Sequence, residues 1–166
     1  MKILYGIYIP DPGGVVFLDG KPFQPTAPID AIRSGLAMVP QEISPSANLS
    51  VADNFFLGRE FTKGILMDQK RMNAETNKVL EELGIPMKVE ELMSEVSVAQ
   101  AQLLAIATAV SYDAKIIIMD EPTTALTEAE VHQLYKIVRK VQERGIAIIY
   151  ISHKLGEVFE LCDEVS

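Results

Sequence analysis

The chain has 166 residues and a net charge of −8, and 48% of its residues are hydrophobic. The length fits one folded domain, or most of one, and the hydrophobic fraction excludes a disordered polypeptide. The acidic balance argues against nucleic acid as the main partner, because phosphate backbones are bound by basic surfaces. The single cysteine, Cys162, excludes an internal disulfide framework and fits a reducing compartment, and no apolar run approaches the roughly 20 residues of a membrane-spanning helix.

The predicted elements alternate between short strands and helices. Residues 15–18 and 21–24 are expected to form a hairpin, because Asp19 and Gly20 between them make a typical two-residue turn. Apolar residues at helical spacing, with capping residues at the ends, predict helices at residues 27–34, 50–57, 68–83, 98–111, 127–144 and 154–161. Continuous apolar runs predict buried strands at residues 36–39, 115–119 and 146–151.

The last two predicted strands and the helix between them have the order of a βαβ unit, in which the two strands run parallel in one sheet. The fold class is therefore expected to be α/β, with a parallel sheet at its centre. The segment at approximately residues 50–112 is rich in helix, and we predict that it forms a helical subdomain within the larger unit.

Two adjacent carboxylates, Asp120 and Glu121, follow the predicted strand at residues 115–119. Ligands of parallel α/β sheets bind at the carboxyl ends of the strands. Two carboxylates held there cost free energy unless a cation or hydrogen-bond donors accompany them, and Mg²⁺ is bound by carboxylates together with phosphate oxygens and water. Asp120 would then support the metal and Glu121 would polarise a water molecule. The alternative interpretation is a solvated pair of carboxylates at a strand end.

Three further polar residues lie at ends of predicted elements. His153 follows the last strand and could contact a phosphate or position a water molecule, or it could be a capping or core histidine. Gln41 follows the predicted buried strand at residues 36–39 and could offer a neutral oxygen to a metal, or it could be an ordinary loop residue. Ser97 precedes a helix whose N-terminus could bind an anion, or it could be a plain cap. Because the strands of a βαβ unit end at the same edge, we expect Glu121 and His153 to converge.

Four segments together resemble the ATP-binding cassette (ABC) ATPases, specifically the ATP-binding subunit of sugar importers of the ribose and galactose type. They are similar to the family's Q-loop (residues 36–42, Leu-Ala-Met-Val-Pro-Gln-Glu), signature motif (95–102, Glu-Val-Ser-Val-Ala-Gln-Ala-Gln), Walker B strand with D-loop (115–127, Lys-Ile-Ile-Ile-Met-Asp-Glu-Pro-Thr-Thr-Ala-Leu-Thr) and switch histidine segment (150–153, Tyr-Ile-Ser-His). Their order and spacing agree over nearly the whole chain. The resemblance implies a partial P-loop NTPase core, so residues 1–166 are expected to be a truncated nucleotide-binding domain, the first of two cassettes in one subunit.

The resemblance also implies roles for individual residues. ATP and Mg²⁺ would be the cofactors, and ATP hydrolysis coupled to carbohydrate import would be the activity. Asp120 would hold Mg²⁺ through water, Glu121 would be the general base for the attacking water, and His153 would contact the γ-phosphate. Gln41 would reach the metal and couple the site to the membrane subunit.

The implied partners follow from the same resemblance. Ser97, Ala99 and Gln100 would touch nucleotide held by an opposing cassette, because sites in this family form between two cassettes. The second cassette, in the same chain or a dimer, and a membrane-spanning permease would be direct partners, and a periplasmic or extracellular sugar-binding protein an indirect one. The chain would be cytoplasmic, peripheral to the inner face of the membrane, and would not bind nucleic acid.

The family's phosphate loop, Gly-x₄-Gly-Lys-Ser/Thr, is missing from this sequence. Its only Gly-Lys pair is Gly20-Lys21, which is followed by Pro22 and has no glycine five residues before it. In the family the loop would end just before Met1, and residues 1–5 resemble the helix that follows it. We therefore expect a chain cut from a longer one, the alternative being a chain with natural termini. Its sheet would have unpaired edges or a gap, and the chain would self-associate or rearrange to cover them. It would bind MgATP poorly and would not hydrolyse it at a normal rate.

Two substitutions depart from the family pattern. Ala99 stands where the signature motif usually has its second glycine, and its Cβ could crowd the approach to phosphate. Thr127 stands where the D-loop usually has aspartate. Two functions from different classes remain open: an ATPase cassette of a transporter, and a non-enzymatic interaction module that keeps only docking surfaces. A cassette ATPase outside transport is less favoured.

Overall fold

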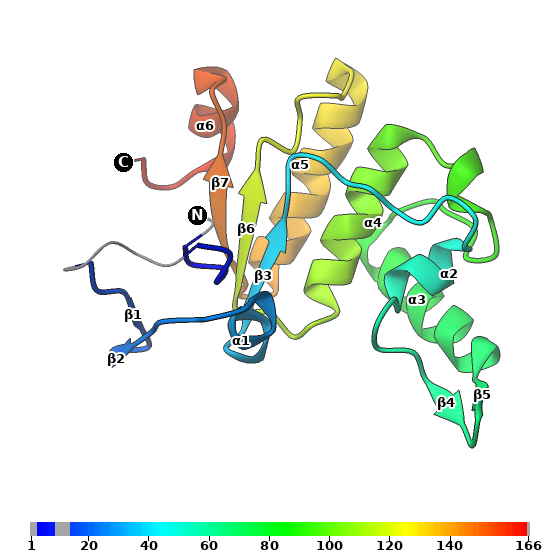
Figure 1. Ribbon diagram of the computed structural model, residues 1–166. Coiled ribbons are helices and arrows are strands. Elements are labelled where there is room, and N and C mark those ends of the chain that lie inside the picture. Colours follow the sequence, from blue (N-terminus) through cyan, green and yellow to red (C-terminus); the bar gives the residue numbers. More distant parts are fainter. Residues whose placement is uncertain (1–2, 9–13, 166) are drawn as a thin grey trace.

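Three parallel strands form the central sheet of the structure, a computed structural model that describes residues 3–8 and 14–165 (Figure 1). The strands are β3 (Leu36–Val39), β6 (Ile116–Asp120) and β7 (Ala147–Ile151), in the spatial order β3-β6-β7. The register pairs Val39 with Met119 and Asp120 with Ile151, so the carboxyl ends of the strands lie at one edge. In the described part of the chain, β3 and β7 each have one strand neighbour. The predicted α/β class with a parallel sheet is confirmed.

The helices lie where they are predicted, with ends no more than two residues from the expected ranges. They are α1 (Pro28–Arg33), α2 (Val51–Phe55), α3 (Gln69–Leu83), α4 (Val98–Val110), α5 (Glu128–Glu143) and α6 (Leu155–Leu161). Capping side chains set several of the N-terminal ends. Ser50, Ser97 and Thr127 each accept a hydrogen bond from the backbone N–H three residues later, at the starts of α2, α4 and α5.

Two hairpins lie outside the central sheet. The predicted one consists of β1 (Phe17–Leu18) and β2 (Lys21–Pro22), joined by Asp19 and Gly20 with φ of 50° and 73°, because a tight hairpin turn requires positive φ at both positions. The second, β4 (Thr62–Lys63) and β5 (Leu66–Met67), is not predicted from the sequence, and neither is the 3₁₀ turn at Met93–Glu95. Strands of two residues are too short for the alternation that identifies a strand.

The helix expected at residues 1–5 is wrong in its described part. Residues 3–6 form a turn, closed by a hydrogen bond of 3.0 Å from the N–H of Gly6 to the carbonyl oxygen of Ile3. Gly6 has a φ of 72°, a left-handed conformation that stops a helix. Residues 1 and 2 lie outside the described residues.

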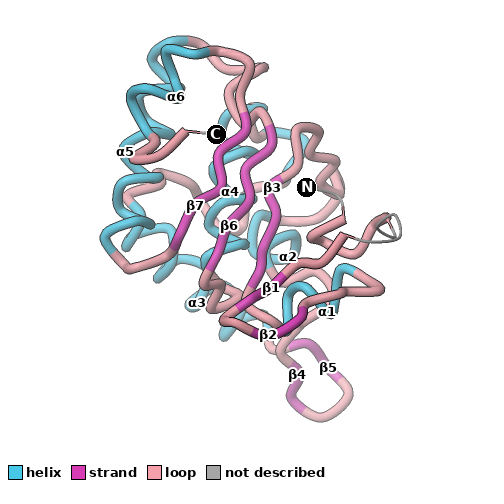
Figure 2. Tube along the Cα trace, turned by 90° about the vertical axis from the view of Figure 1, so that its left-hand side faces the viewer, coloured by secondary structure: helices cyan, strands magenta, loops and turns pink. Residues whose placement is uncertain are grey.

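The two faces of the sheet are covered by different layers (Figure 2). Side chains alternate along β6, so Ile117 and Met119 face α4 and α5, whereas Ile116 and Ile118 face the opposite side. On that opposite side they pack with Ala31 of α1 and with apolar residues of the N-terminal segment and hairpin. Burial on both faces explains why β6 reads as a continuous apolar run in the sequence.

The helices between residues 50 and 112 share one hydrophobic core with the sheet. Phe55 of α2, Met72 and Leu80 of α3 and Leu134 of α5 are all at most 1% exposed and belong to the cluster that contains Ile117 of β6. A separate helical subdomain at approximately residues 50–112 stays a prediction. Among the described residues, no helix combines the length and the apolar character needed to cross a bilayer.

Arg59 links the end of α2 to the end of α4. Its guanidinium group donates hydrogen bonds to the carbonyl oxygen of Phe55 and to both the hydroxyl and the carbonyl oxygen of Ser111. The same group lies 4.2 Å from the ring centroid of Tyr112 and 4.9 Å from that of Phe56. A planar, delocalised cation suits this combination of forked hydrogen bonds and ring contacts, and the compact ammonium group of lysine does not.

We therefore expect Arg59→Lys to lower the free energy of unfolding by about 1–3 kcal/mol, because hydrogen bonds from a charged group and ring contacts are lost together. Urea unfolding of the wild type and the variant measures this difference. Arg33→Lys is the matched control, since Arg33 is exposed at the end of α1. Equal midpoints for the two variants would contradict the role given to Arg59.

Candidate functional site

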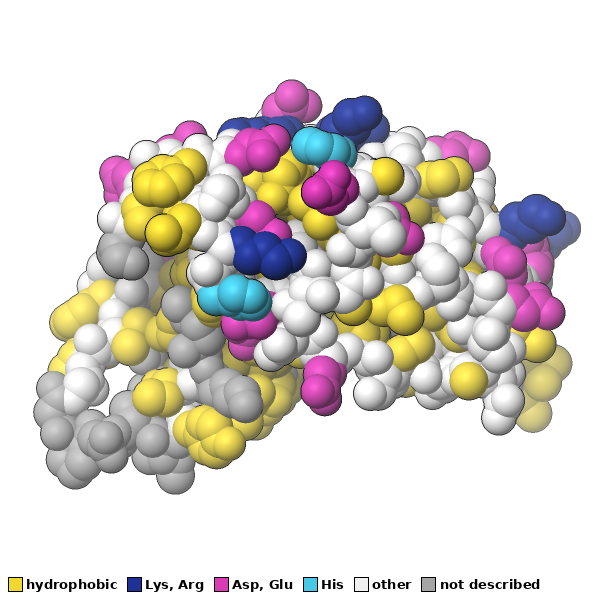
Figure 3. Space-filling model, turned by 90° about the horizontal axis from the view of Figure 1, so that it is seen from above, with side chains coloured by type: hydrophobic (Ala, Val, Ile, Leu, Met, Phe, Trp, Pro, Cys, Tyr) yellow, Lys and Arg dark blue, Asp and Glu magenta, His cyan; other side chains and the backbone are white. Residues whose placement is uncertain are grey.

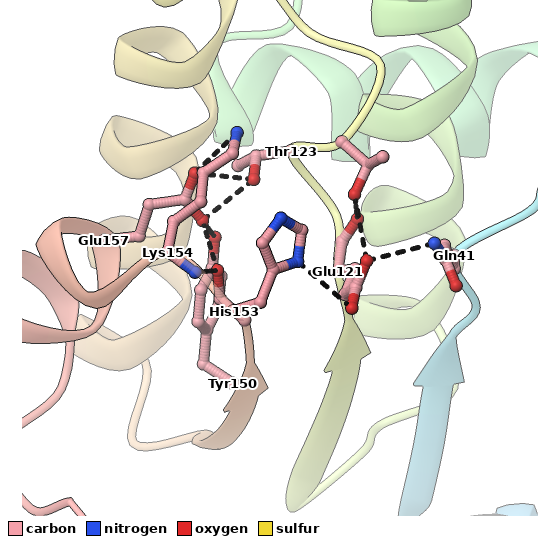
Figure 4. A network of polar contacts seen from close by, with 9 residues as sticks. Gln41, Glu121, Thr123, Tyr150, His153, Lys154 and Glu157 are labelled. Atoms are coloured by element: carbon pink, nitrogen blue, oxygen red, sulfur yellow. Dashed lines mark hydrogen bonds and ion pairs between the residues drawn. The ribbon is translucent and has the colours of Figure 1, made fainter.

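Residues that follow the three parallel strands meet at the carboxyl edge of the sheet (Figure 4). The side-chain amide of Gln41, after β3, donates a hydrogen bond of 3.0 Å to Oε2 of Glu121, after β6. Nδ1 of His153, after β7, lies 3.3 Å from Oε1 of the same carboxylate. The hydroxyl of Thr124 also donates to Oε2, at 3.2 Å. One carboxylate therefore contacts groups from all three strand ends, including the predicted neighbour His153.

The backbone of Glu121 adopts a conformation that is unusual for a residue with a side chain. Its φ is +46°, in the left-handed region, which costs a residue other than glycine roughly 1–2 kcal/mol. The Glu121 N–H donates a hydrogen bond of 2.9 Å to the carbonyl oxygen of Ile151, which extends the pairing of β6 with β7. Such strain persists where surrounding contacts over-determine the conformation, and it is common at functional sites.

Asp120 is the last residue of β6 and lies opposite Ile151 of β7. Its half-buried carboxylate makes no hydrogen bond or ion pair with another described side chain, unlike that of Glu121. Within the described ranges, no group of three or more histidine, cysteine, aspartate or glutamate residues could hold a metal by itself. Asp120 at the end of β6 and Gln41 after the neighbouring strand β3 offer a carboxylate and an amide oxygen. These are ligand types that Mg²⁺ takes together with waters and phosphate oxygens.

A second polar cluster is centred on Glu157 of α6, whose side chain is buried although it carries a charge. Its carboxylate accepts hydrogen bonds from the hydroxyls of Thr123 at 2.7 Å, Tyr150 at 2.9 Å and Ser152 at 2.9 Å. Nζ of Lys154 lies 3.2 Å from Oε1. Seen from above, one histidine lies beside basic and acidic side chains on this face of the molecule (Figure 3).

The ionisation of this cluster follows from burial and hydrogen bonding. Burial raises the pKa of Glu157, but the hydrogen bonds from Thr123, Tyr150 and Ser152 and the contact with Lys154 outweigh it and hold the pKa below its usual value. Burial, followed by the hydrogen bond to Glu157, raises the pKa of Tyr150 well above its usual value. Glu157 is thus the ionised acceptor and Tyr150 a neutral donor.

Sequence reasoning missed Glu157 and its partners Thr123, Tyr150, Ser152 and Lys154. One signal was available: Glu157 precedes the buried Leu161 by one helical turn, so a carboxylate lies on the apolar face of α6. Charged side chains are almost never buried unless they are paired, so this position indicates that Glu157 has polar partners in the folded protein.

The predicted nucleotide contacts of the signature segment lie at the start of α4. Ser97 and Gln100 form a reciprocal capping pair, with Gln100 N–H 3.2 Å from Ser97 Oγ and Ser97 N–H 3.1 Å from Gln100 Oε1. Ala99 is 8% exposed. None of these residues contacts Glu121, so the structure brings together Gln41, Glu121 and His153 and leaves the signature residues at a separate helix start.

A cavity of about 170 Å³ lies between α4 and the carboxyl edge of the sheet. Its lining includes Gln41, Glu121 and Gln102. Gln102 is 5% exposed, and its Nε2 has no hydrogen-bond partner among the described residues. The cavity joins the candidate site to the helix that carries the signature segment.

Known proteins with similar sequences are sugar-import ATP-binding proteins. The chain is 49% identical over all 166 residues to the galactose/methyl galactoside import ATP-binding protein MglA 2 of Photobacterium profundum. It is 46% identical over the same length to the galactose/methyl galactoside import ATP-binding protein MglA of Escherichia coli. The match covers 100% of this chain and 33% of each relative, so the chain spans about a third of the length of these curated relatives.

Solved structures confirm the fold. A nucleotide-free ATP-binding cassette from an ABC transporter superposes with a TM-score of 0.83 at 22% identity, covering 98% of this chain and 68% of the cassette. The ADP conformation of MJ1267, an ATP-binding cassette of an ABC transporter, gives a TM-score of 0.82 at 23% identity, covering 98% of this chain and 67% of that cassette. A family model described as ABC transporter matches residues 1–124. The chain belongs to the ABC transporter family.

Proposed function

We propose that this chain is part of the ATP-binding subunit of a sugar ABC importer, in which hydrolysis of MgATP drives carbohydrate uptake. The observation that carries the proposal is the meeting of Gln41, Glu121 and His153 at the carboxyl edge of the sheet. Two relatives over 45% identical along the whole chain are named galactose/methyl galactoside import ATP-binding proteins, which supports the same substrate class.

The proposed chemistry assigns one task to each group at the edge. Asp120 and Gln41 would hold Mg²⁺, which when bound supplies positive charge to phosphate oxygens. The Glu121 carboxylate would accept the proton of the attacking water as general base. His153 would donate a hydrogen bond to the γ-phosphate. Gln41 contacts Glu121 as well, so its loop would connect the hydrolytic site to the membrane subunit.

The rest of the assembly is part of the proposal. Ser97, Ala99 and Gln100 would bind nucleotide held by a second cassette, and a membrane-spanning permease would be a direct partner. A periplasmic or extracellular sugar-binding protein would deliver the sugar to the permease. The subunit would lie in the cytoplasm, peripheral to the inner face of the cell membrane.

A second candidate is a non-enzymatic module that uses only the docking surfaces of a cassette. It is favoured by Ala99, which stands in the signature segment where the family usually has glycine. The two candidates differ in one measurable respect, because only the ATPase requires Glu121 as a carboxylate.

The proposal can be tested with a hybrid ATP-binding protein. In this hybrid, these 166 residues replace the matching segment of the E. coli relative. We expect the hybrid to hydrolyse MgATP and to restore galactose uptake in cells that lack the relative. Glu121→Gln should lower ATP hydrolysis by a factor of about 10²–10⁴, the usual contribution of a general base, because the amide keeps the shape and loses the basicity. Steady-state phosphate release measures the rate.

Glu128→Gln is the control for the Glu121 prediction, since Glu128 is exposed in the first turn of α5. The control should hydrolyse ATP as fast as the unmodified hybrid. An active hybrid that tolerates Glu121→Gln as well as Glu128→Gln would remove Glu121 from the mechanism. A folded hybrid with no hydrolysis would favour the interaction module.

A substitution at Ala99 is expected to improve the use of ATP, whereas Glu121→Gln is expected to impair hydrolysis. Removing its Cβ lets the backbone approach phosphate more closely, so we expect Ala99→Gly to lower the KM for ATP in the hybrid by roughly two- to tenfold. Glycine inside a helix costs about 0.5–1 kcal/mol in stability. Ala105→Gly, which removes a methyl group in the same helix outside the signature segment, is the control for that cost. A KM that is unchanged, or that moves equally in both variants, would contradict the crowding at Ala99.

A further inference from the structure

Glu157 is the one charged side chain that is buried among the described residues, with 7% of its surface exposed. A buried carboxylate requires donors, and Glu157 has them: both oxygens accept from Thr123, and Oε2 also accepts from Tyr150 and Ser152. The general base and the phosphate contact proposed above do not involve this cluster.

The donors of Glu157 come from both sides of the candidate site. Thr123 lies two residues after Glu121, in the segment that leaves β6. Ser152 and Lys154 are the two chain neighbours of His153, after β7. One carboxylate therefore joins the segment that carries Glu121 to the segment that carries His153, over 34 residues of sequence in the case of Thr123. Figure 4 shows the two networks side by side.

The contact between His153 and Glu121 is partly exposed, and few other contacts hold the imidazole of His153 in place. The side chain of His153 is 63% exposed and that of Glu121 27% exposed, and their closest nitrogen and oxygen atoms are 3.3 Å apart. No other contact fixes the imidazole of His153 to a described residue. Its position depends on the backbone between Ser152 and Lys154, and the Ser152 hydroxyl, itself bound to Glu157, accepts a hydrogen bond from the Lys154 N–H at 3.0 Å.

We propose that Glu157 is a positioning residue that fixes His153 opposite Glu121 by holding the segments after β6 and β7 together. The part of this inference that concerns ATP hydrolysis rests on the proposed function, whereas the geometry of the pair does not. Catalytic groups must be held within about 0.5 Å of their working geometry, and a misplacement of about 1 Å can cost two orders of magnitude in rate. A buried carboxylate on a helix that is anchored in the core by Leu161 meets that requirement.

The deciding experiment is NMR spectroscopy of the 166-residue chain without nucleotide, which compares the wild type with Glu157→Gln, Glu157→Ala and Glu160→Gln. The readout is the ¹H–¹³C signal of the His153 ring, with His132 on α5 as an internal reference. We expect Glu157→Ala to move the His153 signal toward that of a free imidazole and to leave His132 in place. Glu157→Gln should retain an intermediate shift, because its amide oxygen still accepts. Glu160→Gln, on the exposed side of α6, should change neither signal.

Two milder variants keep the test valid if Glu157→Ala does not fold. Thr123→Val and Ser152→Ala each remove one donor, on the Glu121 side and the His153 side respectively, and leave the carboxylate in place. Each should move the His153 signal in the same direction as Glu157→Gln. A His153 signal that stays at its wild-type position in the folded variants, while urea midpoints fall, would show that Glu157 is merely structural and would overturn the proposal.

The hybrid ATP-binding protein adds the kinetic test. Glu157→Gln should lower kcat by about tenfold and change the KM for ATP by less than about twofold, because positioning acts on the reaction and not on nucleotide binding. If the hybrid does not hydrolyse ATP and the His153 signal still moves, the proposed function fails and the positioning of the pair stands. If the hybrid is active and the Glu157 variants match Glu160→Gln in both readouts, the positioning role fails.

Discussion

The parallel pairing of β6 with β3 on one side and β7 on the other is the constraint on which the site depends. Gln41 and Glu121 are 80 residues apart in the chain, and only the sheet brings them within hydrogen-bond distance. Because parallel strands end at the same edge, a residue just beyond each strand projects toward its counterparts. The apolar residues of β6, buried on both faces, hold this alignment, so the packing of the core and the placement of polar groups at its edge have one cause.

Two carboxylates near this edge are stabilised in different ways. Glu121 is partly exposed, lies in a strained backbone conformation and contacts Gln41 and His153. Glu157 is buried in an ordinary helix and is surrounded by hydroxyl donors. Burial without donors would neutralise a carboxylate, and donors without burial would leave it mobile. The combination at Glu157 gives a fixed charge, whereas the arrangement at Glu121 leaves a carboxylate accessible to a ligand.

Much of the fold could be predicted from the sequence, because apolar runs and capping residues are local signals. The strands at residues 36–39 and 146–151 and the caps at Ser97 and Thr127 are examples, and the convergence of Glu121 with His153 followed from the βαβ order. The two-residue strands β4 and β5 carry no such pattern, and Gly6 ends a turn where a helix was expected. The partners of Glu157 could not be predicted, because hydrogen bonds between distant segments depend on distances that local spacing does not give.

The two strand pairs of the sheet differ in sequence separation, that is, in the length of chain between the strands that pair. The pairing of β6 with β7 closes over a single helix, whereas β3 must find β6 across the whole stretch that contains α2, α3 and α4. Contacts of short sequence separation form with a smaller loss of chain entropy and therefore sooner. Chain entropy therefore favours early formation of the βαβ unit at residues 116–151, with β3 joining its edge afterwards. During synthesis on the ribosome, β3 can pack against α1 and α4 as these helices form, but the edge of β3 that pairs with β6 stays without its partner until β6 has emerged.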